Sequence, residues 1–292
     1  MESRYQSGAV VAPRTHTRTF ALVAALLVLV LATGCAKLQA RDQLNKGVQA
    51  YKANKFETAI EHFKNAIQYD PSLTVAKLYL ATACSTQYVP GADNPENKRN
   101  AECAIEQFQK VLEDKQTRQQ DRVLSMKGLA SLYLNMNDFD KAKEYNRKAI
   151  EADPNDADNY YSIAVIDWTQ TYKPRTELRA SLGLTDPKVP IKDKKKCAEL
   201  KDKNWDKVEE GIQMLTKALE IRKDYDDGMA YINLLYRERA DLHCDDPSAR
   251  EADNKTADEW VEKAKTTRQA KAEKAKEQHG IVLDQSKQGE TK

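Results

Sequence analysis

Apolar and small residues recur along the chain at spacings that predict paired helices. Twice, an aromatic residue is followed by alanine, alanine and proline at steps of 3, 7 and 5 residues. The two sets are Phe56, Ala59, Ala66 and Pro71, and Phe139, Ala142, Ala149 and Pro154. Residues three, four or seven positions apart share one face of a helix. Proline then ends the helix, because it has no N–H group to donate. Each set therefore predicts one helix with a packed face and a defined end.

Small residues precede each set and predict where a partner helix crosses closely. We expect Gly47 to face Ala59 and Ala130 to face Ala142, while Phe63 fills the gap to the next helix pair. Together with Tyr133, these residues and their spacing resemble the 34-residue tetratricopeptide (TPR) repeat. The resemblance implies an all-α solenoid of stacked helix-turn-helix repeats, because one such hairpin cannot bury its own apolar face.

Five repeat units cover almost the whole chain after residue 40. Three of them are degenerate and carry insertions between their two helices, around residues 88–95, 169–204 and 243–255. We expect the insertions to cluster along one edge of the stack, and the last segment to be a charged helix followed by a disordered tail after Gly280. The predicted parts are a signal segment at 1–34, a linker at 35–40, repeats near 41–72, 73–115, 123–155, 157–224 and 226–266, and the tail at 267–292.

The N-terminus has the pattern of a bacterial export signal. Arginines flank a 13-residue apolar run, residues 20–32, which is short for a membrane span and ends in Thr-Gly-Cys. A cysteine at this place resembles the lipobox of bacterial lipoproteins, although Ala32 stands where Leu is usual. The resemblance implies cleavage before Cys35 and acylation of its thiol, for example with palmitate. Ala36 rather than Asp after the cysteine favours the periplasmic face of the outer membrane. An ordinary secretory signal and an uncleaved anchor helix are the alternatives.

Charge and cysteine content fit an exported chain that does not bind nucleic acid. Three of the 47 basic residues and one of the 45 acidic residues lie in 1–34, so the remainder has no net charge. Four cysteines follow Cys35, and an even number in an exported chain invites disulfides. Cys84 and Cys103 flank the first insertion, while Cys197 and Cys244 lie in the other two. We expect the bridges Cys84–Cys103 and Cys197–Cys244, with free buried thiols as the alternative.

No pattern of residues predicts catalysis. Glycine-rich phosphate loops and G-x-S-x-G motifs do not occur in the sequence. His243 with Cys244, Asp245, Asp246 and Cys197 offers only a weak metal pattern, because paired ligand spacing is missing. The sequence therefore predicts a protein that is not an enzyme, with no catalytic residue, no metal and no cofactor.

Partner binding is the function that the resemblance implies. TPR positions place seven residues on the groove formed by the first helices: Leu44, Val48, Tyr51, Leu78, Tyr161, Val165 and Trp168. The alternative is that the insertions cover this stripe and make it core. The chain resembles envelope TPR lipoproteins that act as scaffolds, which implies envelope proteins or peptides as partners and attachment to the membrane through lipid.

The second hypothesis is a regulator of a cell-wall enzyme or a glycan-binding envelope module. Tyr160, Tyr161 and Trp168 are the aromatic grouping that such a glycan site would use.

Overall fold

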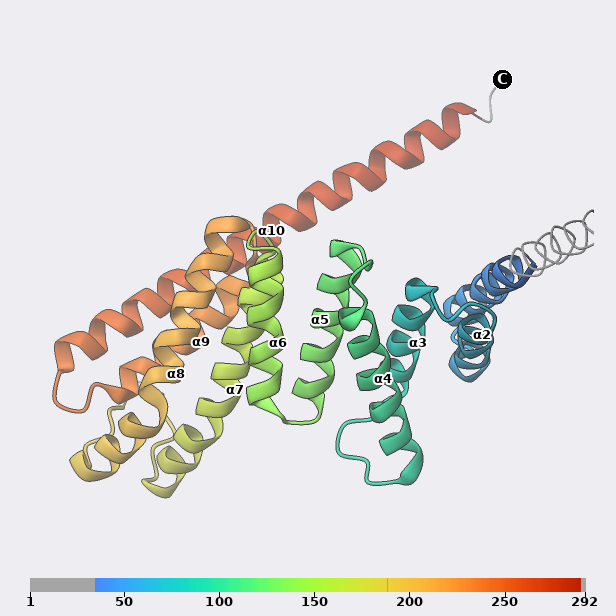
Figure 1. Ribbon diagram of the computed structural model, residues 1–292. Coiled ribbons are helices and arrows are strands. Elements are labelled where there is room, and N and C mark those ends of the chain that lie inside the picture. The colour runs from blue at the N-terminus through green and yellow to red at the C-terminus, as the bar shows by residue number, and fades with distance from the viewer. Residues whose placement is uncertain (1–34, 188, 290–292) are drawn as a thin grey trace, which may run out of the picture. The chain divides into compact units, whose positions relative to one another are not determined.

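The computed structural model describes residues 35–187 and 189–289, with side chains through residue 277, and every regular element in this part is a helix (Figure 1). The signal segment and its lipobox, up to Gly34, lie outside the described residues. The helices are residues 35–52, α2 (Phe56–Tyr69), α3 (Thr74–Gln87), α4 (Pro95–Glu113), α5 (Gln119–Asn135), α6 (Phe139–Ala152), α7 (Ala157–Ser181), α8 (Lys194–Ile221), α9 (Asp226–Leu242) and α10 (Pro247–Gly289).

The chain forms two compact units. The first contains residues 35–88 and 93–117, and the second contains residues 89–92 and 118–289. In the first unit α2 packs on α3 and α3 packs on α4. In the second, each helix from α5 to α10 packs on the next, and α7 also contacts α9. Each unit is thus a stack of antiparallel hairpins, as a solenoid requires.

The alanine seams predicted from the 3-7-5 spacing lie in the interior. Ala59 and Ala66 of α2, and Ala142 and Ala149 of α6, are fully buried. Phe63 is also fully buried and stacks on Tyr79 of α3, with ring centroids 5.6 Å apart. The small residues let two helices approach, and the large ring between them fills the space toward the next hairpin.

The predicted loop of about 35 residues in the fourth repeat is wrong. α7 continues past Trp168 and through Pro174 to Ser181, and α8 begins at Lys194 rather than near Trp205. Proline normally breaks a helix because it removes one backbone hydrogen bond. Here the extension is held by tertiary contacts, since Arg175 and Arg179 donate hydrogen bonds to carboxylates of α9. The insertion is therefore a longer helical hairpin with a short connection.

The first insertion, residues 88–94, has about the predicted length, whereas the last, residues 243–246, is shorter than predicted. α4 begins at Pro95, where Asn94 caps the helix by accepting a hydrogen bond from the backbone N–H of Asn97. α10 begins at Pro247, where Asp246 accepts from the N–H of Ala249 at 2.9 Å. Proline suits the first turn of a helix, because its missing N–H would have no partner there. In both insertions, therefore, a capping residue followed by proline sets where the next helix begins.

Both chain ends of the described region are more helical than predicted. Residues 35–40, predicted as a linker, belong to the first helix. The C-terminal helix continues past Gly280 to Gly289, where a disordered tail was predicted. Alanine, lysine, glutamate and glutamine dominate this end, and these residues have high helix propensity. One glycine in such a run costs about 1 kcal/mol and does not end the helix. None of the described helices is long and apolar enough to cross a bilayer.

The first testable prediction concerns Gly47, which lies against the buried ring of Phe63. A Cβ atom added at Gly47 would lie 2.6 Å from Cδ1 of Phe63. Because this ring is enclosed, we expect Gly47→Ala to lower the free energy of unfolding by about 1–3 kcal/mol, the usual range for overpacking. Thermal unfolding followed by circular dichroism measures this.

The matched control for Gly47 is Gln49→Ala, an exposed position on the same helix. Its unfolding transition should stay unchanged or rise slightly, because alanine favours helix. Equal stability of Gly47→Ala and the unmutated protein would contradict the close contact.

Candidate functional site

The second unit carries a row of five aromatic rings on α7 and at the start of α9. Tyr161 of α7 lies between Tyr225 and Tyr231, with centroid distances of 5.1 and 5.4 Å. Tyr231 also meets Trp168 edge-on at 5.4 Å, and Trp168 lies 4.8 Å from Tyr172. We call these five residues the aromatic row. Edge-to-face and tilted arrangements at such distances are favourable, so the rings hold one another in place.

Exposure changes along the aromatic row. Tyr225 is 8% exposed, Tyr161, Trp168 and Tyr231 are half-buried against the core, and Tyr172 is 45% exposed. Burial raises the pKa of the Tyr161 and Tyr225 hydroxyls above the usual value for tyrosine, so both stay neutral. The row thus runs from an interior anchor to a surface ring, as expected of a binding site supported by its core.

A polar contact fixes the interior end of the row. Oδ1 of Asp158, in the first turn of α7, accepts hydrogen bonds from the Tyr225 hydroxyl and from Nη1 of Arg222, both at 2.9 Å. Burial acts to raise the pKa of Asp158, but the hydrogen bonds from Arg222 and Tyr225 hold it below the usual range. The carboxylate therefore stays charged and ties α7 to the segment before α9. We call this the Asp158 clamp.

A second polar contact fixes the far end, beyond Tyr172. Nε of Arg175 donates to Oδ2 of Asp241 at 2.7 Å, and its Nη1 donates to Glu238 at 3.1 Å. Arg179 donates to the same Asp241 at 2.8 Å and to the carbonyl of Val189 at 3.1 Å. All four charged side chains are buried. We call this group the arginine clamp, and it joins α7, α9 and the connection before α8.

A third charged cluster lies deeper, where α6, α7 and α8 meet. Nζ of Lys143 donates to Oδ1 of fully buried Asp167 and to Glu210 at 2.9 Å, and Glu210 also pairs with Arg147 at 2.5 Å. Oδ2 of Asp167 is buried and has no hydrogen-bond partner among the described residues. Burial therefore outweighs the Lys143 contact and raises the pKa of Asp167 to about 7.

The predicted groove residues belong to both units. In the first unit, Leu44, Val48 and Tyr51 are half-buried, and the Tyr51 hydroxyl lies 3.0 Å from Oγ1 of Thr86. Leu78 is only 7% exposed, so it does not lie on an open groove as predicted.

In the second unit, the structure brings together Tyr161 and Trp168 through Tyr231, while half-buried Val165 lies on the same helix. Sequence reasoning missed Tyr172, Tyr225 and Tyr231. Tyr172 is one helical turn beyond Trp168, a spacing that was available in the sequence. Tyr231 required knowledge of how α9 is aligned with α7.

The cysteines pair in the structure as the insertions suggested. Cys84 is bonded to Cys103, with Cα atoms 6.0 Å apart, and Cys197 is bonded to Cys244, with Cα atoms 5.6 Å apart. Cys35 is free and exposed. No group of three or more histidine, cysteine or acidic residues in the described part of the chain is placed to hold a metal ion.

Residues 123–156 match the tetratricopeptide repeat family, and this segment spans most of α5 and all of α6. No curated protein matches the chain in sequence.

The solved structures that resemble the fold include two of MamA proteins. "Crystal structure of MamA protein" is 15% identical, covers 80% of this chain and 94% of that one, and has a TM-score of 0.51. "MamA 41-end from Desulfovibrio magneticus RS-1" is 16% identical, covers 80% and 96%, and has a TM-score of 0.50. At this identity the likeness concerns the fold alone, and it confirms the predicted all-α solenoid of the TPR type.

The second testable prediction concerns the buried carboxyl of Asp167. Its pKa is raised from 3.8 to about 7 in the folded protein, so between these values the folded state binds the proton more tightly than the unfolded state does. This contribution to stability is present at low pH and is lost as the pH rises through about 7. We expect Asp167→Asn to gain about 2 kcal/mol relative to the unmutated protein between pH 5 and pH 8.

Urea unfolding of both proteins at the two pH values measures this gain. The control is Asp140→Asn, an exposed carboxylate on α6. Its stability relative to the unmutated protein should not change with pH. A constant difference for Asp167→Asn across this range would show that Asp167 ionises normally.

Proposed function

We propose that the protein is a membrane-anchored scaffold of the bacterial envelope that binds a partner protein on the aromatic row. The observation that carries this proposal is the exposed ring of Tyr172 beside half-buried Trp168, with the other end of the row held by the Asp158 clamp. Aromatic side chains that are fixed before binding lose little entropy and often dominate protein interfaces. A solenoid presents such residues on a continuous surface without needing a catalytic centre.

The cysteines support an exported, lipid-anchored location. Two disulfides are typical of proteins outside the reducing cytosol. Cys35 stands apart from these four cysteines because it is unbonded, exposed and directly follows the apolar signal pattern. A free thiol at this position suits acylation, and Ala36 favours the outer membrane. Multiple acyl chains would give stable attachment, whereas one chain is marginal.

The third prediction tests the aromatic row by photo-cross-linking in cells. Benzoylphenylalanine at position 172 should capture a defined envelope protein, whereas the same group at position 261 should not. Tyr172 and Val261 are both exposed large side chains, at 45% and 38%. After the captured protein is identified, its binding to the purified chain should weaken about tenfold or more with Trp168→Ala, as for an interface anchor.

Two results would contradict the aromatic row as a protein-binding surface. One is equal capture from positions 172 and 261. The other is retention of the protein on isolated cell wall that Trp168→Ala and Tyr172→Ala abolish, without any captured protein. This second result would favour the glycan-binding alternative.

The fourth prediction concerns the anchor. An alkyne analogue of palmitate supplied to the bacterium should label the protein, and Cys35→Ser should remove the label and release the protein from membranes. Cys197→Ser is the control, because this cysteine is buried in a disulfide, and it should keep the label. Membrane attachment of Cys35→Ser that survives a carbonate wash would contradict the lipid anchor.

A further inference from the structure

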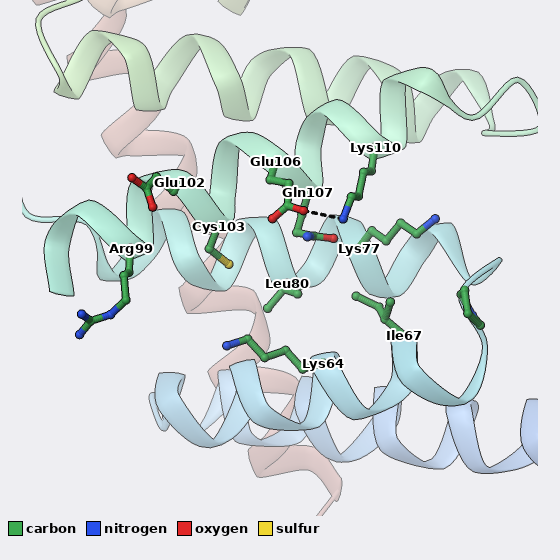
Figure 2. Close-up of a pocket in the computed structure, with 11 residues that line it drawn as sticks. Lys64, Ile67, Lys77, Leu80, Arg99, Glu102, Cys103, Glu106, Gln107 and Lys110 are labelled. Carbon is green, nitrogen blue, oxygen red and sulfur yellow. Dashed lines mark hydrogen bonds and ion pairs between the residues drawn. The ribbon is translucent and has the colours of Figure 1, made fainter. Parts of the chain in front are cut away.

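The first unit contains a cleft that is distinct from the aromatic row. It has a volume of about 550 Å³, within the range of ligand sites, and its lining residues all come from α2, the turn after it, α3 and α4 (Figure 2). Helix α3 forms the floor, since it packs on both α2 and α4. The bond between Cys84 and Cys103 joins α3 to α4, and Cys103 itself lines the cleft. The cleft is therefore covalently supported on one side.

Four of the eleven lining residues are basic, and they come from all three helices. Lys64 belongs to α2, Lys77 to α3, and Arg99 and Lys110 to α4. Figure 2 shows Arg99 and Lys77 at opposite ends of the cleft, with Lys64 between them on the α2 side. The positive charges are thus spread along the cleft and do not converge on one point.

The basic charges are only partly neutralised within the cleft. Lys110 pairs with Glu106 at 2.6 Å. Lys77 has a charge interaction with Asp114. Lys64, Arg99 and the remaining lining carboxylate, Glu102, have no ion pair within the part of the chain that the structure describes. With Asp114 counted beside the two lining carboxylates, four basic and three acidic groups leave an excess of one positive charge.

The floor between the charges is apolar. Leu80 is 3% exposed, and half-buried Ile67 lies beside it on the α2 wall. Arg99 and Lys110 are eleven positions apart, so the α4 wall is about 16 Å long at 1.5 Å per helical residue. About five residues of extended polypeptide span this length at 3.3 Å each.

We infer that this cleft binds an extended acidic segment of a partner protein, in which carboxylates alternate with an apolar side chain. The carboxylates meet Lys64, Arg99 and Lys77, and the apolar side chain rests on Ile67 and Leu80. A single phosphate would engage only one of the separated cations. A flat anionic membrane would face the carboxylates of Glu102 and Glu106 on the α4 side and would not enter the cleft.

The test is fluorescence anisotropy with the full chain in detergent and two labelled peptides. The acidic probe is Glu-Leu-Glu-Leu-Glu, and the neutral probe is Gln-Leu-Gln-Leu-Gln. The acidic probe should bind, and rising salt should weaken it because the charges are exposed. Lys64→Gln with Arg99→Gln should weaken it about fivefold, the range for two exposed ion pairs.

The matched control is Lys37→Gln with Lys52→Gln, two exposed lysines on the first helix that do not line the cleft. This variant should bind the acidic probe like the unmutated protein, and circular dichroism should show the same unfolding transition for all three proteins. Tyr172→Ala should also leave the acidic probe bound. The peptide-binding result therefore tests the cleft alone and does not depend on whether the aromatic row binds a partner.

Four outcomes would overturn the inference. The first is that the neutral peptide binds as tightly as the acidic one. The second is that the Lys64→Gln, Arg99→Gln variant binds the acidic peptide like its control. Alternatively, inorganic phosphate displaces the acidic peptide more than chloride of equal ionic strength does, which would indicate a small-anion site. Finally, phosphatidylglycerol vesicles bind in a manner that requires Lys64 and Arg99 while the acidic peptide does not bind.

Discussion

The alignment of α7 with α9 is the constraint on which the aromatic row depends. The row takes three rings from α7, one from α9 and one, Tyr225, from the residue before α9. A shift of one helical turn between the two helices, about 5.4 Å, would separate Tyr231 from Tyr161 and Trp168. The Asp158 clamp and the arginine clamp lie at the two ends of this contact. Apolar contacts change little when two helices slide past each other, whereas hydrogen bonds between charged groups form in only one alignment of the helices. The clamps therefore determine which rings meet.

Such clamps specify position more than they add stability. Burying an ion pair costs several kcal/mol of desolvation per charge, and the attraction between the charges only about offsets it. Glu238 shows this cost, because burial raises its pKa to about 7 even though Arg175 lies against it. Apolar residues of similar volume often replace such buried pairs without loss of stability. The charges hold the extension of α7 through Pro174, which directly follows Trp168 and Tyr172.

The parts of the fold that sequence predicted well are those set by local spacing. Two sets of residues at steps of 3, 7 and 5 located α2 and α6, because small side chains at a helix crossing leave few alternatives. The insertions were predicted poorly, because Pro174 marks a helix end in local terms while Arg175 and Arg179 are held by carboxylates more than 60 positions away. The candidate site divides in the same way. Tyr161 and Trp168 follow from repeat positions, but Tyr231 joins them only through the packing of α9.

The two units present different surface chemistry, and the two proposed binding surfaces differ accordingly. The aromatic row is made of rings, so contacts with it would depend on shape and buried area and would change little with salt. The cleft of the first unit presents separated cations around an apolar floor, so contacts with it would depend on charge and would weaken as salt rises. Exposed charges contribute more to partner choice and association rate than to affinity, whereas buried aromatic anchors contribute mainly to affinity. A partner with both an acidic segment and an apolar surface could bind both units. Once one of its two parts is bound, the other is held nearby at a raised effective concentration, so it binds more readily.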